Sequence, residues 1–68
     1  MNEEQRKIIK KLANKAGSIV IGSNSETNRN KVIEFNELKD KAITVGVWER
    51  FCRVAGVSIE CNGADFAA

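Results

Sequence analysis

Apolar side chains near the start of the chain recur at the spacing of one face of a helix, with basic residues beside them. Asn2 followed three positions later by Gln5 is typical of a capping box, and Gly17 suits a left-handed helix end. The pattern predicts a helix over residues 3–16. Its apolar stripe consists of Ile8, Ile9, Leu12 and Ala16.

Two short runs rich in β-branched residues follow, at 18–22 and 31–35. Such side chains favour strands, and Gly17 and Gly22 bound the first run. Every residue from 23 to 30 is polar, which is typical of a segment that has nothing to bury. We therefore expect a hairpin whose two strands are joined by a long polar loop.

The second half of the chain returns to helical spacing. Residues 36–42 favour a brief helical segment. A longer helix is expected to begin at Thr44 or Val47 and to end at Ala55, while an alternating strand over 43–47 is the competing interpretation. The apolar positions at helical spacing are Val45, Trp48, Phe51, Cys52 and Ala55, followed by Gly56 as a stop signal.

The end of the chain completes the predicted order of elements. Residues 57–61 alternate apolar and polar side chains, as in a half-buried strand. The pair Asn62-Gly63 then favours a turn, and residues 63–68 are expected to be a loose tail. The order is therefore α-β-β-α-β. It predicts one small α+β domain over residues 1–68, with a short antiparallel or mixed sheet and helices packed on one face.

The charges of the chain are nearly balanced, since eleven Lys and Arg residues against nine Asp and Glu residues give a formal net charge of +2. Residues 1–34 carry seven basic and four acidic side chains, whereas residues 35–68 carry four and five. This asymmetry falls well short of the basic stripe expected of a protein that binds mainly phosphate backbones.

Catalysis is not expected from this set of side chains. The chain has no histidine and no tyrosine, which removes the usual Ser-His and Cys-His pairs and any phenolic acid. No glycine-rich phosphate loop with its lysine is present either. We therefore predict a protein that is not an enzyme and that uses no cofactor.

Cys52 and Cys61 are the only cysteines, and their spacing fits no zinc motif, so we expect no metal site. Two reduced, partly buried thiols in a cytoplasmic protein are the favoured interpretation, and a disulfide between them is the alternative. The first residues are charged rather than apolar, which argues against a secretory signal. No apolar run has the length of a membrane span, so a membrane partner is not expected.

Three features are candidates for recognition of a partner. The first is a row of basic residues beside the apolar stripe of the N-terminal helix, namely Arg6, Lys7, Lys10, Lys11 and Lys15. The second is the polar loop. The third is Trp48, which we expect at the centre of the core rather than in an exposed binding hot spot. The residues at which contact with a partner is expected are Arg6, Lys7, Lys10, Lys11, Asn28 and Arg29.

Residues 51–58 resemble the first helix and turn of a bacterial helix-turn-helix. In that motif a small residue, a glycine four positions later, an apolar residue and a serine recur, and Cys52, Gly56, Val57 and Ser58 occupy those positions. The resemblance implies a second helix running on from Ile59. That helix would contain the Asn62-Gly63 turn pair, so the match covers eight residues and identifies no family.

We interpret the chain as a small protein-binding module, a regulator, inhibitor or adaptor of a larger partner, that uses the basic row and the polar loop. The alternative is a small regulatory protein that binds nucleic-acid phosphates. Homo-oligomerisation is compatible with either role, because it would cover an unpaired sheet edge. The alternative role would use Lys7, Lys10, Lys11, Arg29, Arg50 and Arg53.

Overall fold

The computed structural model describes all 68 residues, which form four helices and no strand. The predicted α+β class is therefore wrong: the protein is a small all-α domain, 71% helical. The helices are α1 (Glu3–Ser18), α2 (Glu26–Thr44), α3 (Trp48–Ala55) and α4 (Gly63–Ala67).

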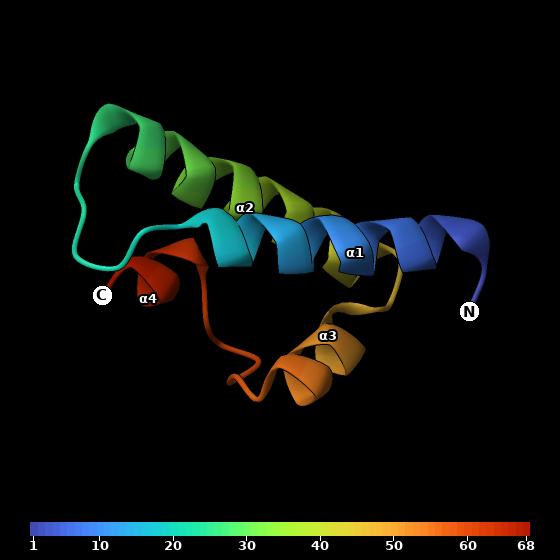
Figure 1. The fold of residues 1–68 in the computed structure, drawn as a ribbon. Helices are drawn as coiled ribbons and strands as arrows, with labels where there is room; N and C mark the ends of the chain where they lie inside the picture. Colours follow the sequence, from blue (N-terminus) through green and yellow to red (C-terminus); the bar gives the residue numbers. More distant parts are fainter.

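Helices α1 and α2 lie side by side and run in opposite directions, and α3 and α4 lie beneath this pair at its two ends (Figure 1). The most extensive packing between any two elements is that of α1 against α2. Helix α4 packs on α2 near the α1–α2 loop, while α3 contacts both α1 and α2. The two long helices therefore act as the base on which the two short helices rest.

Helix α1 confirms the predicted N-terminal helix and extends it by two residues, to Ser18. Asn2 and Gln5 form the predicted capping box, with the Asn2 Oδ1 accepting from the Gln5 amide at 2.8 Å. Gly17 does not end the helix in a left-handed conformation, as we had expected, because the chain leaves α1 in an extended conformation at Ile19. Of the apolar stripe, Ile8 and Leu12 are buried.

The predicted hairpin is wrong, because residues 26–44 form one helix and residues 19–25 are a loop. Ser25 caps α2 by accepting a hydrogen bond from the Asn28 amide at 3.2 Å. The buried residues of α2 are Asn28, Phe35 and Ala42, which are seven positions apart and so lie on one face of a helix. This packing overrides the strand propensity of the β-branched residues, which is a weak preference that depends on context.

Helix α3 confirms the predicted helix that ends at Ala55, and it begins directly after Val47. The alternative prediction of a strand over 43–47 is excluded. Gly56 ends the helix in the left-handed conformation, with φ of 71°. The strand predicted over 57–61 is absent, and this segment is irregular apart from a turn at Ile59 and Glu60. Its backbone bonds to α3 instead of to a neighbouring strand: the Val57 amide donates to the Cys52 carbonyl at 3.0 Å.

The expected loose tail is also wrong, since residues 63–67 form α4. Asn62 and Asp65 make a second capping box there, and the Asp65 carboxylate accepts from the Asn62 amide at 2.8 Å. Gly63 allows α4 to meet α2 closely, because a Cβ at this position would lie 2.6 Å from the Val32 carbonyl oxygen. The Gly63 amide donates to the Asn36 side chain at 2.7 Å, which fixes this approach.

An aromatic cluster around Phe35 fills the centre of the molecule. The ring of Phe35 lies 4.9 Å from that of Phe66 and 6.1 Å from those of Trp48 and Phe51, between centroids. Trp48 is buried in this core, as predicted, and its indole N–H donates to the Ile59 carbonyl at 2.8 Å. One core thus receives side chains from all four helices.

The resemblance to a helix-turn-helix does not extend past the turn that follows α3. After Gly56 the chain makes turns through Ile59, and the next helix begins only at Gly63 and is five residues long. No helix in the position of a recognition helix follows α3.

Candidate binding surfaces

Four of the five residues of the basic row predicted on the N-terminal helix lie on the solvent side of α1, whereas Lys15 is half-buried in the groove between α1 and α2. Arg6, Lys7, Lys10 and Lys11 are all exposed. Two of them have partners within the chain: Arg6 donates to the Met1 carbonyl at 2.9 Å, and Lys7 forms an ion pair with Glu3 at 3.6 Å. Lys10 and Lys11 form no ion pair, so their charges remain available to a partner.

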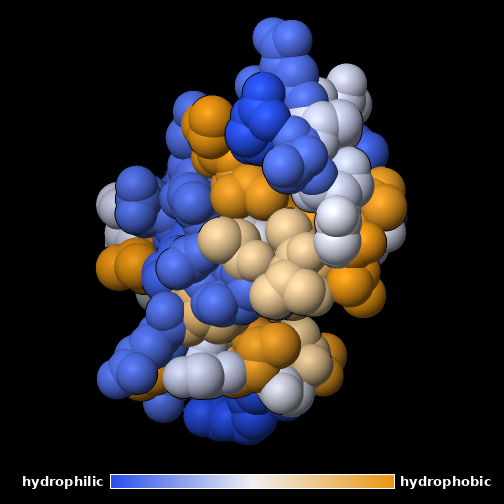
Figure 2. Space-filling view, turned by 90° about the vertical axis from the view of Figure 1, so that its left-hand side faces the viewer, coloured by the Kyte–Doolittle hydropathy of each residue, from blue (hydrophilic) through white to orange (hydrophobic).

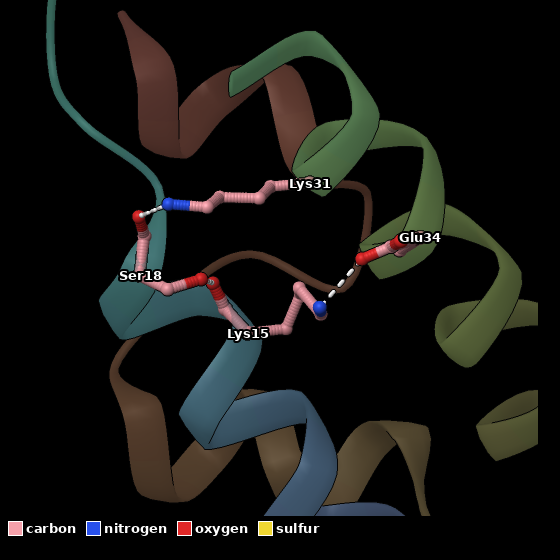
Figure 3. A network of polar contacts seen from close by, with 4 residues as sticks. All are labelled: Lys15, Ser18, Lys31 and Glu34. Carbon is pink, nitrogen blue, oxygen red and sulfur yellow. Dashed lines mark hydrogen bonds and ion pairs between the residues drawn. The ribbon is translucent and has the colours of Figure 1, made fainter. Parts of the chain in front are cut away.

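Two lysines of the groove between α1 and α2 hold the two helices together (Figure 3). The Lys15 ammonium meets the Glu34 carboxylate of α2 at 2.5 Å. The Lys31 ammonium of α2 donates to the Ser18 carbonyl at 2.9 Å, which satisfies a free carbonyl at the end of α1. Both lysines therefore stabilise the helix pair, and the charge of Lys15 is balanced by a carboxylate.

Asn28 is buried, with 3% of its surface exposed, and it fastens the α1–α2 loop to α2. Its side-chain oxygen accepts from the Val20 amide at 2.7 Å, and its side-chain nitrogen donates to the carbonyls of Val20 at 3.1 Å and Ser23 at 2.8 Å. The oxygen and both N–H groups of the amide are thus engaged inside the chain. The structure gives Asn28 a structural role at a position where we expected contact with a partner.

Arg29, the other expected contact in this region, is exposed on the first turn of α2. One guanidinium nitrogen donates to the Asn24 carbonyl, which orients the side chain along the α1–α2 loop. A guanidinium carries five N–H donors in a fixed geometry, so most of its hydrogen-bonding capacity remains free. Arg29 is therefore both positioned and available.

Beside Arg29 lies a mainly apolar groove between α2, α4 and the α1–α2 loop, which we call the end groove. The groove has an apolar floor and polar residues at its rim. The loop that borders it is tied to α4 by a hydrogen bond of 2.7 Å from the Gly22 amide to the Ala67 carbonyl. The residues that line the end groove are Ser23, Asn24, Asn28, Arg29, Val32, Ile33, Ala64 and Ala67.

The end groove and the adjoining loop expose large apolar side chains. Ile21 is 76% exposed, Val20 55% and Ile33 54%. Figure 2 shows this end of the molecule, where apolar residues gather in the middle of the face and hydrophilic residues lie above and to the left. Sequence reasoning missed this surface, because it forms only when α4 docks on α2.

A second apolar hollow lies at the other end of α2, where Ile43 and Ile59 flank Trp48. Ile43 is 54% exposed, the same fraction as Ile33. The Trp48 indole N–H already donates to the Ile59 carbonyl. Glu49 lines the hollow, and its carboxylate pairs with Arg53 at 3.9 Å. This hollow has no free hydrogen-bond donor comparable to Arg29.

Cys52 and Cys61 are unpaired thiols, and both belong to the buried core. Burial raises the pKa of the Cys52 thiol, and Cys61 raises it further. Burial likewise raises the pKa of Cys61, against which the positive charge of Lys39 acts in the opposite direction. Both groups are therefore protonated at neutral pH.

No group of three or more histidine, cysteine, aspartate or glutamate side chains is placed to hold a metal ion. None of the helices is both long enough and apolar enough to cross a lipid bilayer. Comparison of the chain with protein-family models, with curated proteins and with solved structures finds no significant match.

Proposed function

We propose that this chain is a small, non-enzymatic protein-binding module of the cytoplasm whose partner docks in the end groove. The observation that carries the proposal is a mainly apolar groove lined by the exposed Ile33, next to a loop on which Val20 and Ile21 are also exposed. Monomeric proteins rarely leave such side chains together on the surface, and an apolar patch with a polar rim is typical of a site for another protein. The chain has no histidine or tyrosine with which to add catalysis.

The polar residues that border the groove can form hydrogen bonds, which its apolar side chains cannot. Arg29 offers free N–H donors beside Ile33, and Ser23 and Asn24 border the same groove. Interfaces commonly combine an apolar centre with a polar rim, and arginine is enriched in them. A partner segment with apolar side chains flanked by a carboxylate or by free carbonyl groups fits this arrangement.

The basic residues of α1 have a separate part in the proposal. Lys10 and Lys11 are unpaired on an exposed helix face, and Arg6 and Lys7 flank them. Such a row attracts an acidic partner from a distance, which raises the association rate more than the final affinity. Charge reversal on α1 should therefore make binding slower and less sensitive to salt, without removing it.

The test compares two isoleucines of α2 that are equally exposed. A partner is first isolated from the source organism with the wild-type chain and then titrated as a purified protein. Ile33→Glu, in the end groove, is expected to weaken its binding at least about tenfold, because it places a charge in an apolar contact. Ile43→Glu, at the far end of α2, is expected to bind like the wild type.

Circular dichroism of both variants checks that they fold. Equal affinity for Ile33→Glu and the wild type, or an equal loss in both variants, would contradict docking in the end groove. Sedimentation of the wild type distinguishes a different protein from a second copy of the chain as the occupant.

Nucleic-acid binding through phosphates is the second candidate function, and the free charges of Lys10 and Lys11 favour it. The basic residues considered for this role are spread over three helices: the lysines lie on α1, Arg29 on α2, and Arg50 and Arg53 on α3. A phosphate-binding protein loses affinity steeply as salt rises. Titration of random-sequence DNA and RNA at low salt tests this candidate, and an absence of binding there excludes it.

A further inference from the structure

We propose that the segment of the partner that occupies the end groove is an acidic amphipathic helix. A carboxylate of this helix binds the Arg29 guanidinium, and an apolar side chain one turn away packs on Ile33. This inference rests on the proposed function, because it requires a partner that docks in the end groove. It adds the conformation of the bound segment and the chemical group that the groove selects.

The charge of the groove is complementary to a carboxylate. Arg29 is the only charged residue among those that line the end groove. It forms no ion pair within the chain, not even with Glu26, which lies three positions earlier on α2. One terminal nitrogen donates to the Asn24 carbonyl, so the edge formed by Nε and the other terminal nitrogen remains free. A carboxylate can accept two parallel hydrogen bonds from such an edge.

The spacing of the groove residues sets the spacing of the groups that they bind. Arg29 and Ile33 lie four positions apart on α2, so their side chains are neighbours along one face of this helix. With a rise of about 1.5 Å per residue, they are separated by about 6 Å along the helix axis. A partner helix that carries a carboxylate and an apolar side chain three or four positions apart therefore meets both residues.

The walls of the groove favour a helix over other forms of a bound segment. Extended segments commonly bind by adding a strand to a sheet edge, and this chain has no strand. Polyproline segments bind grooves lined by aromatic rings, and no aromatic residue lines the end groove. An amphipathic helix in an apolar groove is the common mode that fits walls formed by α2 and α4. The small side chains of Ala64 and Ala67 on α4 allow such a helix to approach closely.

The carboxylate belongs to an Asp or Glu side chain rather than to a free C-terminus. A C-terminal carboxylate is typically held by a nest of successive backbone N–H groups. In the loop that borders the groove, no two successive amides of residues 20–25 are free. The amides that already donate to acceptors within the chain are those of Val20, Gly22, Ser23 and Ser25.

The experiment selects binding peptides on the immobilised full-length chain from a phage-displayed library of random peptides, each long enough for about four helical turns. We expect the enriched peptides to share an acidic residue one turn from large apolar residues. As synthetic peptides, they should bind Ile33→Glu at least about tenfold more weakly than the wild type. Arg29→Gln should weaken binding about five- to tenfold. Arg50→Gln, which changes an exposed arginine of α3 without an ion pair, is the matched control and should bind like the wild type.

Two changes in the peptide test the contact and the conformation. Glutamine in place of its acidic residue completes a double-mutant cycle with Arg29→Gln. This peptide should bind the wild type more weakly than the parent peptide does, but it should bind Arg29→Gln as well as the parent does. Proline at a position that faces away from the groove should remove binding, because it breaks a helix. Circular dichroism checks that each variant of the chain folds.

The outcomes separate this proposal from the proposed function. Independent losses in the cycle, or enriched peptides without an acidic residue, would overturn the contact with Arg29, and a loss with Ile33→Glu would still support docking in the end groove. Equal binding to Ile33→Glu and to the wild type would contradict docking in the groove itself. Binding that survives proline, or a library without any enriched peptide, would overturn the helical occupant, and the proposed function keeps its separate test with the isolated partner. A dimer of the chain that Ile33→Glu dissociates would assign the groove to a second copy.

Discussion

At the scale of single residues, Asn28 shows how a polar side chain becomes part of the core. A buried amide is stable only when its donors and acceptor are paired, and Val20 and Ser23 supply those pairs through their backbones. Neighbouring asparagines lack this function, because Asn24 and Asn30 are exposed. The sequence marked this segment as polar but held no sign of which asparagine turns inward.

Asn28→Ala is expected to reduce the free energy of unfolding by about 2–3 kcal/mol, because it leaves backbone groups of the α1–α2 loop without their partners. Asn30→Ala is the matched control, because Asn30 is exposed on the same helix, and it should change the free energy of unfolding by less than about 0.5 kcal/mol. Urea denaturation of both variants measures the difference. Equal stabilities of the two variants would show that the Asn28 hydrogen bonds do not stabilise the loop.

At the scale of the elements, the sequence pattern correctly predicted α1 and α3, whereas α2 and α4 were not predicted. Helix α1 has local signals at its start, an Asn2–Gln5 capping box and a stripe of apolar residues. Helix α3 combines helical spacing with Gly56 as its end. In both helices the residues that decide the structure are adjacent in the sequence, so their interactions require no knowledge of the tertiary fold.

Helix α2 was divided into a loop, a strand and a short helical segment because its inward face starts with Asn28 instead of an apolar residue. The signal that would have found it is the spacing of Val32, Phe35, Leu38 and Ala42, which continues at helical periodicity through the predicted strand. Helix α4 is shorter than two turns and depends on contact with α2. The end groove depends on both elements, so it too was beyond prediction from local patterns.

The docking of α4 leads to a prediction about two glycines. Gly63→Ala would place a methyl group 2.6 Å from the Val32 carbonyl oxygen, so we expect α4 to shift and the protein to lose about 1–3 kcal/mol of stability. Gly17→Ala is the matched control, because an added Cβ there meets nothing within 4 Å inside α1. Thermal unfolding should show a gain of up to about 1 kcal/mol for this control. A Gly63→Ala protein as stable as the wild type would contradict the close approach of α4.

At the scale of the whole molecule, one small core joins the four helices, so a change in the protonation of core groups should affect the stability of the entire chain. The two thiols are the groups concerned. Burial holds the pKa of Cys52 and of Cys61 above the usual value for a thiol, so the folded protein keeps these protons at a pH where the unfolded chain releases them.

Stability should therefore be unaffected by these thiols at neutral pH and should fall as the pH rises above about 8.5, the ordinary pKa of a cysteine. Urea denaturation of the reduced protein at pH 7 and at pH 9.5 measures the change, with a reducing agent present to prevent disulfide formation. The double variant Cys52→Ala/Cys61→Ala provides the control, and its loss of stability between the two pH values should be smaller. An equal loss in both proteins would assign the alkaline destabilisation to groups other than the buried thiols.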